Sequence, residues 1–496
     1  MTGGPTQAEG LTARPGHGAA RASTAEVEDQ AGRLRNATLV QQVLEGVPGP
    51  AIGFLQEAVR WWDQWLKGVD SGIMDGPCLR VWLQDYVVPA TFHAVRPGRW
   101  AHEPSWPPAA VRPVALDLRG DGTLSTADDL DADRPGGEGV GGETPADRGG
   151  GGGTGSGAFA AGVVPAELAI RGRQECGETA GVWCANGNPD EIAGDQSPDD
   201  LRSLCFTTGS LRAPVEVLGY PRVRLRLSVD QPCALLNVRL EDVAPDGASL
   251  LVSWGLLNLT HRDSHEIPSP LEPGRWYEVE IESRVCGHRF EKGHRIRLAL
   301  SPTYWPQAWP SPEPVELRIA VGGPSALDLP VRTRGPGADV DRTTEMTPSF
   351  APPEVAGFVG APGRTAGGAA EGQAESAPRP RRDRRSRTVQ FDAGSGRHEI
   401  VDHEEHERTI PATGARYLDL ATDIYAIIED EPLSATVRCE RETRSTGSAV
   451  GWRVTIASEM SCDRHTFNVK EEYAAYEEDV LVLTKSRTYA IPREWV

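Results

Sequence analysis

Hydrophobic residues recur with two different periods along this chain. Between Pro50 and Lys67 they return every three or four positions, which is the spacing of one face of an α-helix. The stripe consists of Ile52, Leu55, Val59, Trp62 and Leu66. Pro50 suits a first helical turn, and Gly68 suits the left-handed position just after a last one. We therefore expect a helix over 50–67, and its three tryptophans predict that it packs against a large surface.

From residue 78 onward the period changes to two. Apolar side chains alternate with polar ones in short runs that are separated by Gly- and Pro-containing turns. The alternating sets are Leu79/Val81/Leu83, Val223/Leu225/Leu227, Leu236/Val238/Leu240, Val279/Ile281, Ile296/Leu298/Leu300 and Val315/Leu317/Ile319. Many short strands with almost no helix predict a mainly β protein, built as a sandwich or jelly roll.

Alternation returns near the end of the chain and predicts a second β unit. Expected strands cover 388–392, 397–401, 416–421, 434–442, 451–460, 464–473 and 479–489. Strands of this number and length could form an antiparallel meander or half-barrel. Low-complexity stretches surround these units. We expect a disordered segment at 1–45, a flexible Gly-rich insertion at 130–160, and a disordered linker at 331–386 that ends in a solvated basic run. The terminal β module then occupies 387–496.

Composition narrows the classes of partner. The formal net charge of −20 and the pI near 5.1 argue against nucleic acid and anionic membranes, since both attract basic surfaces. No run of about 18 apolar residues predicts a membrane helix, and the N-terminus lacks a signal-peptide pattern. The eight cysteines are dispersed without a CxxC pair, which favours a reducing compartment over a zinc ribbon. We expect a soluble cytoplasmic protein.

Several phrases of the sequence resemble one enzyme family in both order and spacing. They are 49–54, 61–68, 79–84, 97–100, 104–107, 183–187, 194–196, 199–200, 242–247, 256–266 and 301–314. Together they resemble the C-terminal part of the CocE/NonD serine hydrolases, relatives of the Xaa-Pro dipeptidyl-peptidases. The resemblance is specific over about 47–323 and weaker over 388–496. It implies a jelly-roll (galactose-binding-like) β-sandwich at 78–330, preceded at 46–77 by a helical remnant of the junction with a hydrolase domain.

The chemistry of that family requires a nucleophilic serine on a G-x-S-x-G turn, a histidine base and an orienting aspartate. No serine here has glycine at both minus two and plus two; Ser156, Ser325, Ser395 and Ser448 come nearest. Val40 falls where the resemblance implies the histidine, and valine accepts no proton. We therefore assign no catalytic, cofactor-binding or metal-ligating residue, and we expect a truncated chain that lacks the catalytic core.

Two polar clusters contain residue types that can bind a metal. His261 and His265 lie four apart beside Asp263 and Glu266, which would suit zinc on a helix, but the segment follows a strand and predicts a structural loop with an Arg262–Asp263 ion pair. The stretch 117–128 resembles a calcium loop through Asp117 and Asp121. Arg119 at its third position repels a cation, so a β-turn is favoured. No cofactor is expected.

Two further motifs have simple structural interpretations. The loop around Tyr304, Trp305 and Trp309 would suit a carbohydrate platform, although packing is favoured. The run 403–406, His-Glu-Glu-His, is expected in a solvated acidic turn.

Three functions remain open on the sequence. The first is the non-catalytic C-terminal portion of a CocE/NonD-type hydrolase, partnered by an α/β-hydrolase domain or self-associating through the helix 50–67. Family activity would be serine hydrolysis of acyl esters, amides or N-terminal Xaa-Pro dipeptides. The second is a stand-alone jelly-roll module that binds carbohydrate or peptide. The third, a divergent hydrolase with another nucleophile, has no paired Ser/His/Asp arrangement to support it.

Overall fold

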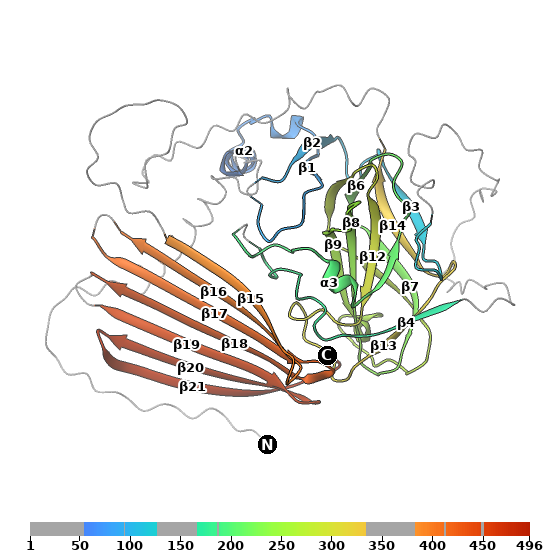
Figure 1. Cartoon of the computed structure of the whole chain (residues 1–496). Helices are drawn as coiled ribbons and strands as arrows, with labels where there is room; N and C mark the ends of the chain where they lie inside the picture. The colour runs from blue at the N-terminus through green and yellow to red at the C-terminus, as the bar shows by residue number, and fades with distance from the viewer. Residues whose placement is uncertain are drawn as a thin grey trace, which may run out of the picture.

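The computed structural model describes residues 54–93, 95–125, 166–185, 188–333, 382–410, 413–447 and 451–496. Within these residues the chain is mostly β, as the alternating pattern predicts, and it forms two β units with a helix beside the first (Figure 1). The segment 1–45, the helical positions 50–53, Val40, and most of the expected Gly-rich insertion and linker lie outside the described residues.

The first unit is a β-sandwich of two sheets. The larger sheet has the order β2-β1-β11-β6-β14-β7-β13-β4, with β10 also paired to β7 and β3 to β14. Its strands are β1 (Leu79–Asp85), β2 (Gly98–Glu103), β3 (Val111–Asp117), β4 (Glu167–Arg171), β6 (Val215–Gly219), β7 (Arg222–Val229), β10 (Tyr277–Glu282), β11 (Cys286–Phe290), β13 (Glu316–Ala320) and β14 (Ala326–Arg332). The smaller sheet, β5-β12-β8-β9, consists of β5 (Leu204–Thr207), β8 (Leu235–Val243), β9 (Ser249–Asn258) and β12 (Arg295–Ser301).

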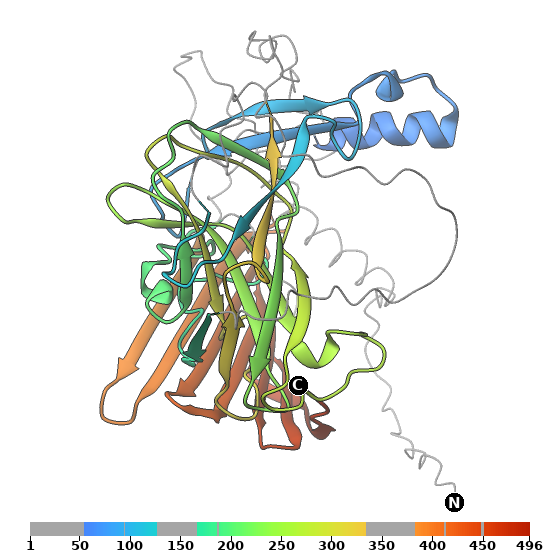
Figure 2. The same cartoon turned by 90° about the vertical axis from the view of Figure 1, so that its right-hand side faces the viewer.

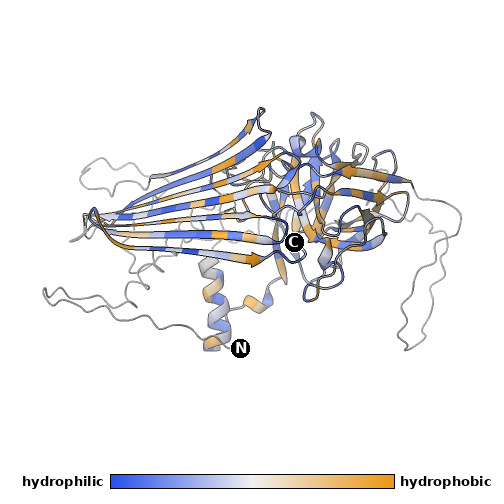
Figure 3. Ribbon diagram, turned by 90° about the horizontal axis from the view of Figure 1, so that it is seen from below, coloured by the Kyte–Doolittle hydropathy of each residue, from blue (hydrophilic) through white to orange (hydrophobic). Residues whose placement is uncertain are grey.

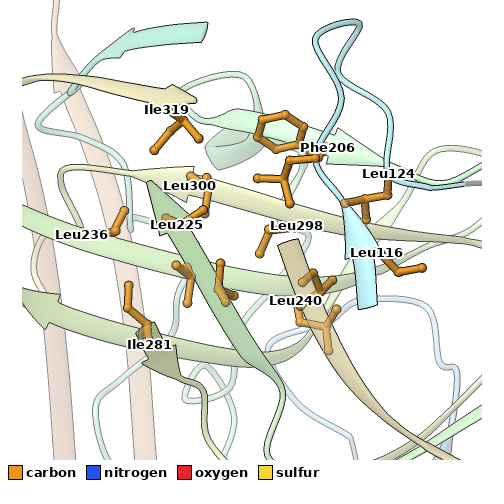
Figure 4. Close-up of a cluster of buried hydrophobic side chains, with 14 of the residues drawn as sticks. Leu116, Leu124, Phe206, Leu225, Leu236, Leu240, Ile281, Leu298, Leu300 and Ile319 are labelled. Atoms are coloured by element: carbon orange, nitrogen blue, oxygen red, sulfur yellow. The ribbon is translucent and has the colours of Figure 1, made fainter. Parts of the chain in front are cut away.

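The core of the sandwich is built by the residues that the two-residue period singled out. Leu225 of β7 lies close to Leu298 and Leu300 of β12, which belongs to the other sheet (Figure 4), and all three are buried in one cluster. Burying a leucine side chain contributes about 1.5–3 kcal/mol, so this shared layer is the main source of stability in the first unit. Three short helical segments lie in the connections of this unit, namely η1 (Ile73–Asp75), α3 (Ser197–Asp200) and η3 (Leu259–His261).

The second unit is a single seven-stranded antiparallel meander in chain order. Its strands are β15 (Arg382–Asp392), β16 (Arg397–Thr409), β17 (Arg416–Ile428), β18 (Glu431–Thr446), β19 (Trp452–Cys462), β20 (Thr466–Glu477) and β21 (Val480–Pro492). The strands lie side by side in one curved sheet, and one end of this sheet lies against the sandwich (Figures 1 and 2). Hydrophilic and hydrophobic residues are interspersed along these strands (Figure 3).

Two sequence expectations are wrong in this unit. The described part of the basic run expected in the linker, from Arg382 onward, lies within β15, and the histidine-rich run 403–406 lies in the middle of β16 rather than in a turn. Both strands continue past the predicted limits because they pair in register over their whole length, from Arg382 opposite Glu407 to Asp392 opposite Arg397. Arginines of β15 face carboxylates of β16 in these extensions, and such charge pairs stabilise neighbouring strands. The extensions were not predicted because they lack the alternation of apolar and polar residues.

The predicted helix is present as α2 (Phe54–Lys67), and Gly68 closes it with φ of 66°, the left-handed conformation that favours glycine. α2 lies beside β1 and β2, away from the core of the sandwich (Figures 1 and 2). Among the residues that the structure describes, no helix is long and apolar enough to cross a membrane.

Candidate functional site

The serines nearest to a nucleophile turn have structural roles where the structure describes them. Ser325 is fully buried, and its hydroxyl donates to the Ala320 carbonyl at 2.7 Å and accepts from the Arg226 amide at 3.1 Å. The Ser395 hydroxyl donates to Asp392 Oδ2 at 2.6 Å in the turn after β15. Neither hydroxyl is hydrogen-bonded to a histidine, so neither is activated as a nucleophile. Ser156 and Ser448 lie outside the described residues.

The two polar clusters weighed as metal sites take local structural contacts. The imidazole rings of His261 and His265 lie 5.6 Å apart, and the predicted Arg262–Asp263 ion pair is confirmed at 3.2 Å. Asp121 Oδ1 accepts hydrogen bonds from the amide and hydroxyl of Thr123, which closes a turn. These two hydrogen bonds lower the pKa of the Asp121 carboxyl. The described part of the chain brings no group of three His, Cys, Asp or Glu side chains together as a metal site.

The aromatic loop after β12 is an internal contact. Tyr304 and Trp305 are 1% and 2% exposed, and Trp305 packs on Ile427 and Ala435 of the second unit. A buried indole cannot stack on a sugar, so packing is the role of this loop.

One Asp–His arrangement exists that sequence reasoning missed. Asp242 on β8 is fully buried, and its two oxygens lie 2.8 Å from His288 Nε2 and 2.8 Å from His294 Nδ1. The phrase 242–247 was singled out for its resemblance, but the histidines were not, although His288 lies in the buried register of β11 between Cys286 and Phe290. The inward alternation of β11 is the signal that could have found it.

This arrangement lacks an active nucleophile. The Cys286 thiol precedes His288 by two residues and shares its face of β11, but burial raises the pKa of that thiol to about 12. A thiol with such a pKa is protonated at neutral pH and does not attack a carbonyl. The buried carboxylate between two imidazoles therefore connects β8 to β11 and to His294, the residue just before β12.

The feature best suited to a function is a surface, formed by α2. Its polar residues face the rest of the chain: Glu57 pairs with Arg80 of β1 at 3.1 Å, and Gln64 accepts from the Ser71 amide at 3.0 Å. Its apolar residues face outward, with Trp62, Trp65 and Leu66 exposed by 54%, 56% and 74%. An amphipathic helix normally buries its apolar stripe. The expectation that these tryptophans pack on a large surface is thus not met within the described chain.

A pocket lies on β1, the strand that Glu57 of α2 contacts. This cavity of about 450 Å³ is lined by residues of β1, β11 and neighbouring segments, among them Trp82, Gln84, Arg96, Trp106, Tyr220 and His288. The Arg96 guanidinium donates to Gln84 at 2.8 Å, and burial lowers the pKa of Arg96. Trp106 and Tyr220 meet edge to face at 6.3 Å and remain partly exposed. We define the docking face as the exposed side of α2 together with this pocket.

Comparison with known proteins identifies the sandwich. Residues 71–334 match the domain family described as the X-Pro dipeptidyl-peptidase C-terminal non-catalytic domain. The cocaine esterase of Rhodococcus sp. (strain MB1 Bresler) is 33% identical over 124 residues, which are 24% of this chain and 21% of the esterase. A putative serine esterase of Mycobacterium bovis is 25% identical over 287 residues, which are 52% of this chain and 37% of the esterase.

Among solved structures, an aminopeptidase from the marine sediment archaeon Thaumarchaeota archaeon aligns over 55% of this chain and 43% of its own, at 18% identity and a TM-score of 0.39. The match to the curated relatives thus spans only about a fifth to two fifths of their length.

Proposed function

Because this chain belongs to the family defined by the X-Pro dipeptidyl-peptidase C-terminal non-catalytic domain, the part that accompanies hydrolases of the CocE/NonD type, we propose that its docking face binds an α/β-hydrolase domain. The single observation that carries the proposal is the outward-facing apolar stripe of α2. Large exposed apolar patches on soluble proteins mark interaction sites.

The chemistry of the docking face favours a protein partner. Trp61 and Trp65 contact each other with ring centroids 5.7 Å apart and planes tilted by 51°, and exposed tryptophans are enriched among the residues that dominate binding energy at protein interfaces. The pocket on the sandwich adds Trp82 and the partly exposed Trp106 to the aromatic side chains that a partner could contact. A hydrolase domain seated there would be buttressed by β1 and β11 and would place its cleft against the sandwich.

The partner supplies the catalytic residues in this proposal. The whole sequence has no G-x-S-x-G serine, and the buried Asp242 pair has no activated nucleophile. Ester, amide or Xaa-Pro dipeptide hydrolysis would therefore belong to the assembled hydrolase. The eight free cysteines support a reducing compartment such as the cytoplasm.

Turnover by the chain alone tests the non-catalytic half of the proposal. With p-nitrophenyl acetate and with Ala-Pro-p-nitroanilide, the purified chain is expected to release product no faster than buffer. Hydrolysis that a serine-directed phosphonate abolishes would contradict the proposal, because it would reveal a nucleophile in this chain.

Binding tests the docking face. A catalytic α/β-hydrolase domain from the source genome is titrated against the chain by isothermal calorimetry. The double substitution Trp62→Glu with Trp65→Glu should weaken binding at least tenfold, since each buried interface tryptophan is worth about 2 kcal/mol or more. Leu201→Glu is the matched control, because Leu201 is 91% exposed on the surface beside α3 and lies outside the docking face. Equal affinity of all three proteins would refute the docking role.

A further inference from the structure

The last strand, β21, is an unprotected sheet edge. It pairs with β20 on one side only, and it ends the strand order of the seven-stranded sheet. All of its residues are exposed, including six large apolar ones: Val480, Leu481, Val482, Leu483, Tyr489 and Ile491. A long exposed edge strand presents unpaired backbone donors and acceptors, which is a template for another strand.

Contacts with the sandwich distinguish the opposite edge from this one. On β15 at the other end of the sheet, Arg385 Nη1 donates to Glu191 of the sandwich at 3.0 Å, and Arg387 pairs with Asp402 at 2.8 Å. The β15 edge is thus engaged with the first unit, whereas β21 carries only exposed side chains, with Lys485 and Arg487 as its cations. Pairing of β21 with a second β21 uses the exposed edge and leaves the β15 contacts in place.

The register of such a pair is restricted by a bulge. Leu481 is opposite Tyr476 and Leu483 is opposite Ala475, so Val482 has no partner on β20 and the strand bends there. The regular part of β21 therefore starts at Leu483. When two copies of a strand pair antiparallel about a two-fold axis, the numbers of every two facing residues have the same sum. One residue therefore faces its own copy, and the axis passes between these two identical residues.

Like charges exclude most of the remaining registers. An axis at Lys485 or at Arg487 places that residue opposite itself, and an axis at Ser486 places Lys485 opposite Arg487. Directly opposed like charges destabilise a strand pair. An axis at Thr488 instead places Arg487 opposite Tyr489 and Lys485 opposite Ile491. Arg487 Nη1 lies 3.5 Å from the Tyr489 hydroxyl of its own strand, and this register adds the second copy's Tyr489 ring directly opposite the guanidinium, within reach of a cation–π contact.

We propose that this protein forms a two-fold dimer in which residues 484–492 of β21 pair antiparallel with the same residues of a second copy, with the axis at Thr488. The paired edges satisfy each other's free backbone groups and join the two seven-stranded sheets into one. Two Arg487–Tyr489 contacts between the copies fix the register.

Sedimentation velocity over a range of concentrations tests the dimer. All variants carry Trp62→Glu and Trp65→Glu, so that association through α2 is not measured. Tyr489→Lys places a lysine opposite Arg487 twice and should raise the dimer dissociation constant at least tenfold. Leu481→Lys introduces the same charge on the same exposed strand but outside the overlap, and it should change the constant less than threefold. A monomer at every concentration, or equal effects of the two lysines, overturns the proposal.

Cross-linking tests the register directly. In a background with the exposed Cys78 and Cys184 replaced by serine, Thr488→Cys places two thiols across the axis, where opposed Cα atoms lie about 4.5–5.5 Å apart. Oxidation should then give a covalent dimer. Ser486→Cys is the matched control, because its copies are separated by four residues along the strand, or about 14 Å. Preferential cross-linking of the Ser486→Cys variant overturns the Thr488 register.

Discussion

At the scale of single residues, the least expected feature is a fully buried ion cluster on β8. Arg239 Nε donates to Glu241 Oε1 at 2.8 Å, and Arg239 Nη2 donates to Asp200 Oδ1 at 3.1 Å. The period of two predicted Leu236, Val238 and Leu240 as core, which is confirmed, and it implied that the residues between them face water. They do not, because the loop segments that carry Cys176 and Asp200 cover that face of β8. An alternating pattern predicts that one face of a strand is buried. It cannot predict that segments distant in the sequence also bury the other face.

This cluster predicts how stability depends on pH. Burial raises the pKa of Glu241 from 4.5 to about 8, with Arg239 opposing the shift. An acid whose folded pKa is raised stabilises the fold below its unfolded pKa and loses that contribution as pH rises through the folded pKa. Unfolding free energy should therefore fall between pH 5 and 8, by at most about 1.4 kcal/mol per pH unit from this group.

Glu241→Gln should remove that part of the pH dependence, because glutamine keeps a neutral acceptor for Arg239. Urea unfolding of the variant and the parent should agree at pH 5, and the variant should be the more stable at pH 9. The exposed Glu282→Gln is the control and should follow the parent at both pH values. A Glu241→Gln variant that is less stable at pH 9 would show that the carboxylate is ionised and needed.

At the scale of elements, the sequence predicted which segments form but not how α2 is attached. The apolar stripe suggested burial, whereas the polar residues Glu57 and Gln64 make the contacts to the chain.

Glu57→Gln should loosen the helix by removing its ion pairs with Arg60 and Arg80, each worth about 0–1 kcal/mol at a surface. Hydrogen exchange of amides in α2 should accelerate severalfold while the melting temperature stays nearly constant. Asp63→Asn is the matched control, since Asp63 pairs with Lys67 inside the helix only.

At the scale of the whole molecule, the joint between the two units was invisible in the sequence. His398 Nδ1 of β16 lies 2.6 Å from Glu178 of the sandwich, and Asn258 and Thr260 both donate to the Trp495 carbonyl at 2.8 Å. These contacts connect residues more than 200 positions apart, which no local pattern encodes. The sequence predicts two units separated by a linker, and it predicts packing for the aromatic loop after β12 without indicating that the second unit is what the loop packs on.

Trp305 is the centre of that joint, and its removal should uncouple the units. Its ring meets Trp309 at 5.4 Å and Tyr425 of the second unit at 6.4 Å. Trp305→Ala should cost about 3–5 kcal/mol through the cavity it leaves. Because that loss falls on the interface, calorimetry should resolve two unfolding transitions where the parent shows one.

The exposed Trp183, 53% accessible, supplies the matched control for that experiment. Trp183→Ala removes an indole of the same size from the surface of the sandwich, so the single transition should persist with a loss of about 1 kcal/mol or less. Should Trp305→Ala also melt in one step, shifted to lower temperature, the second unit would depend on the sandwich through its polar contacts rather than through this ring.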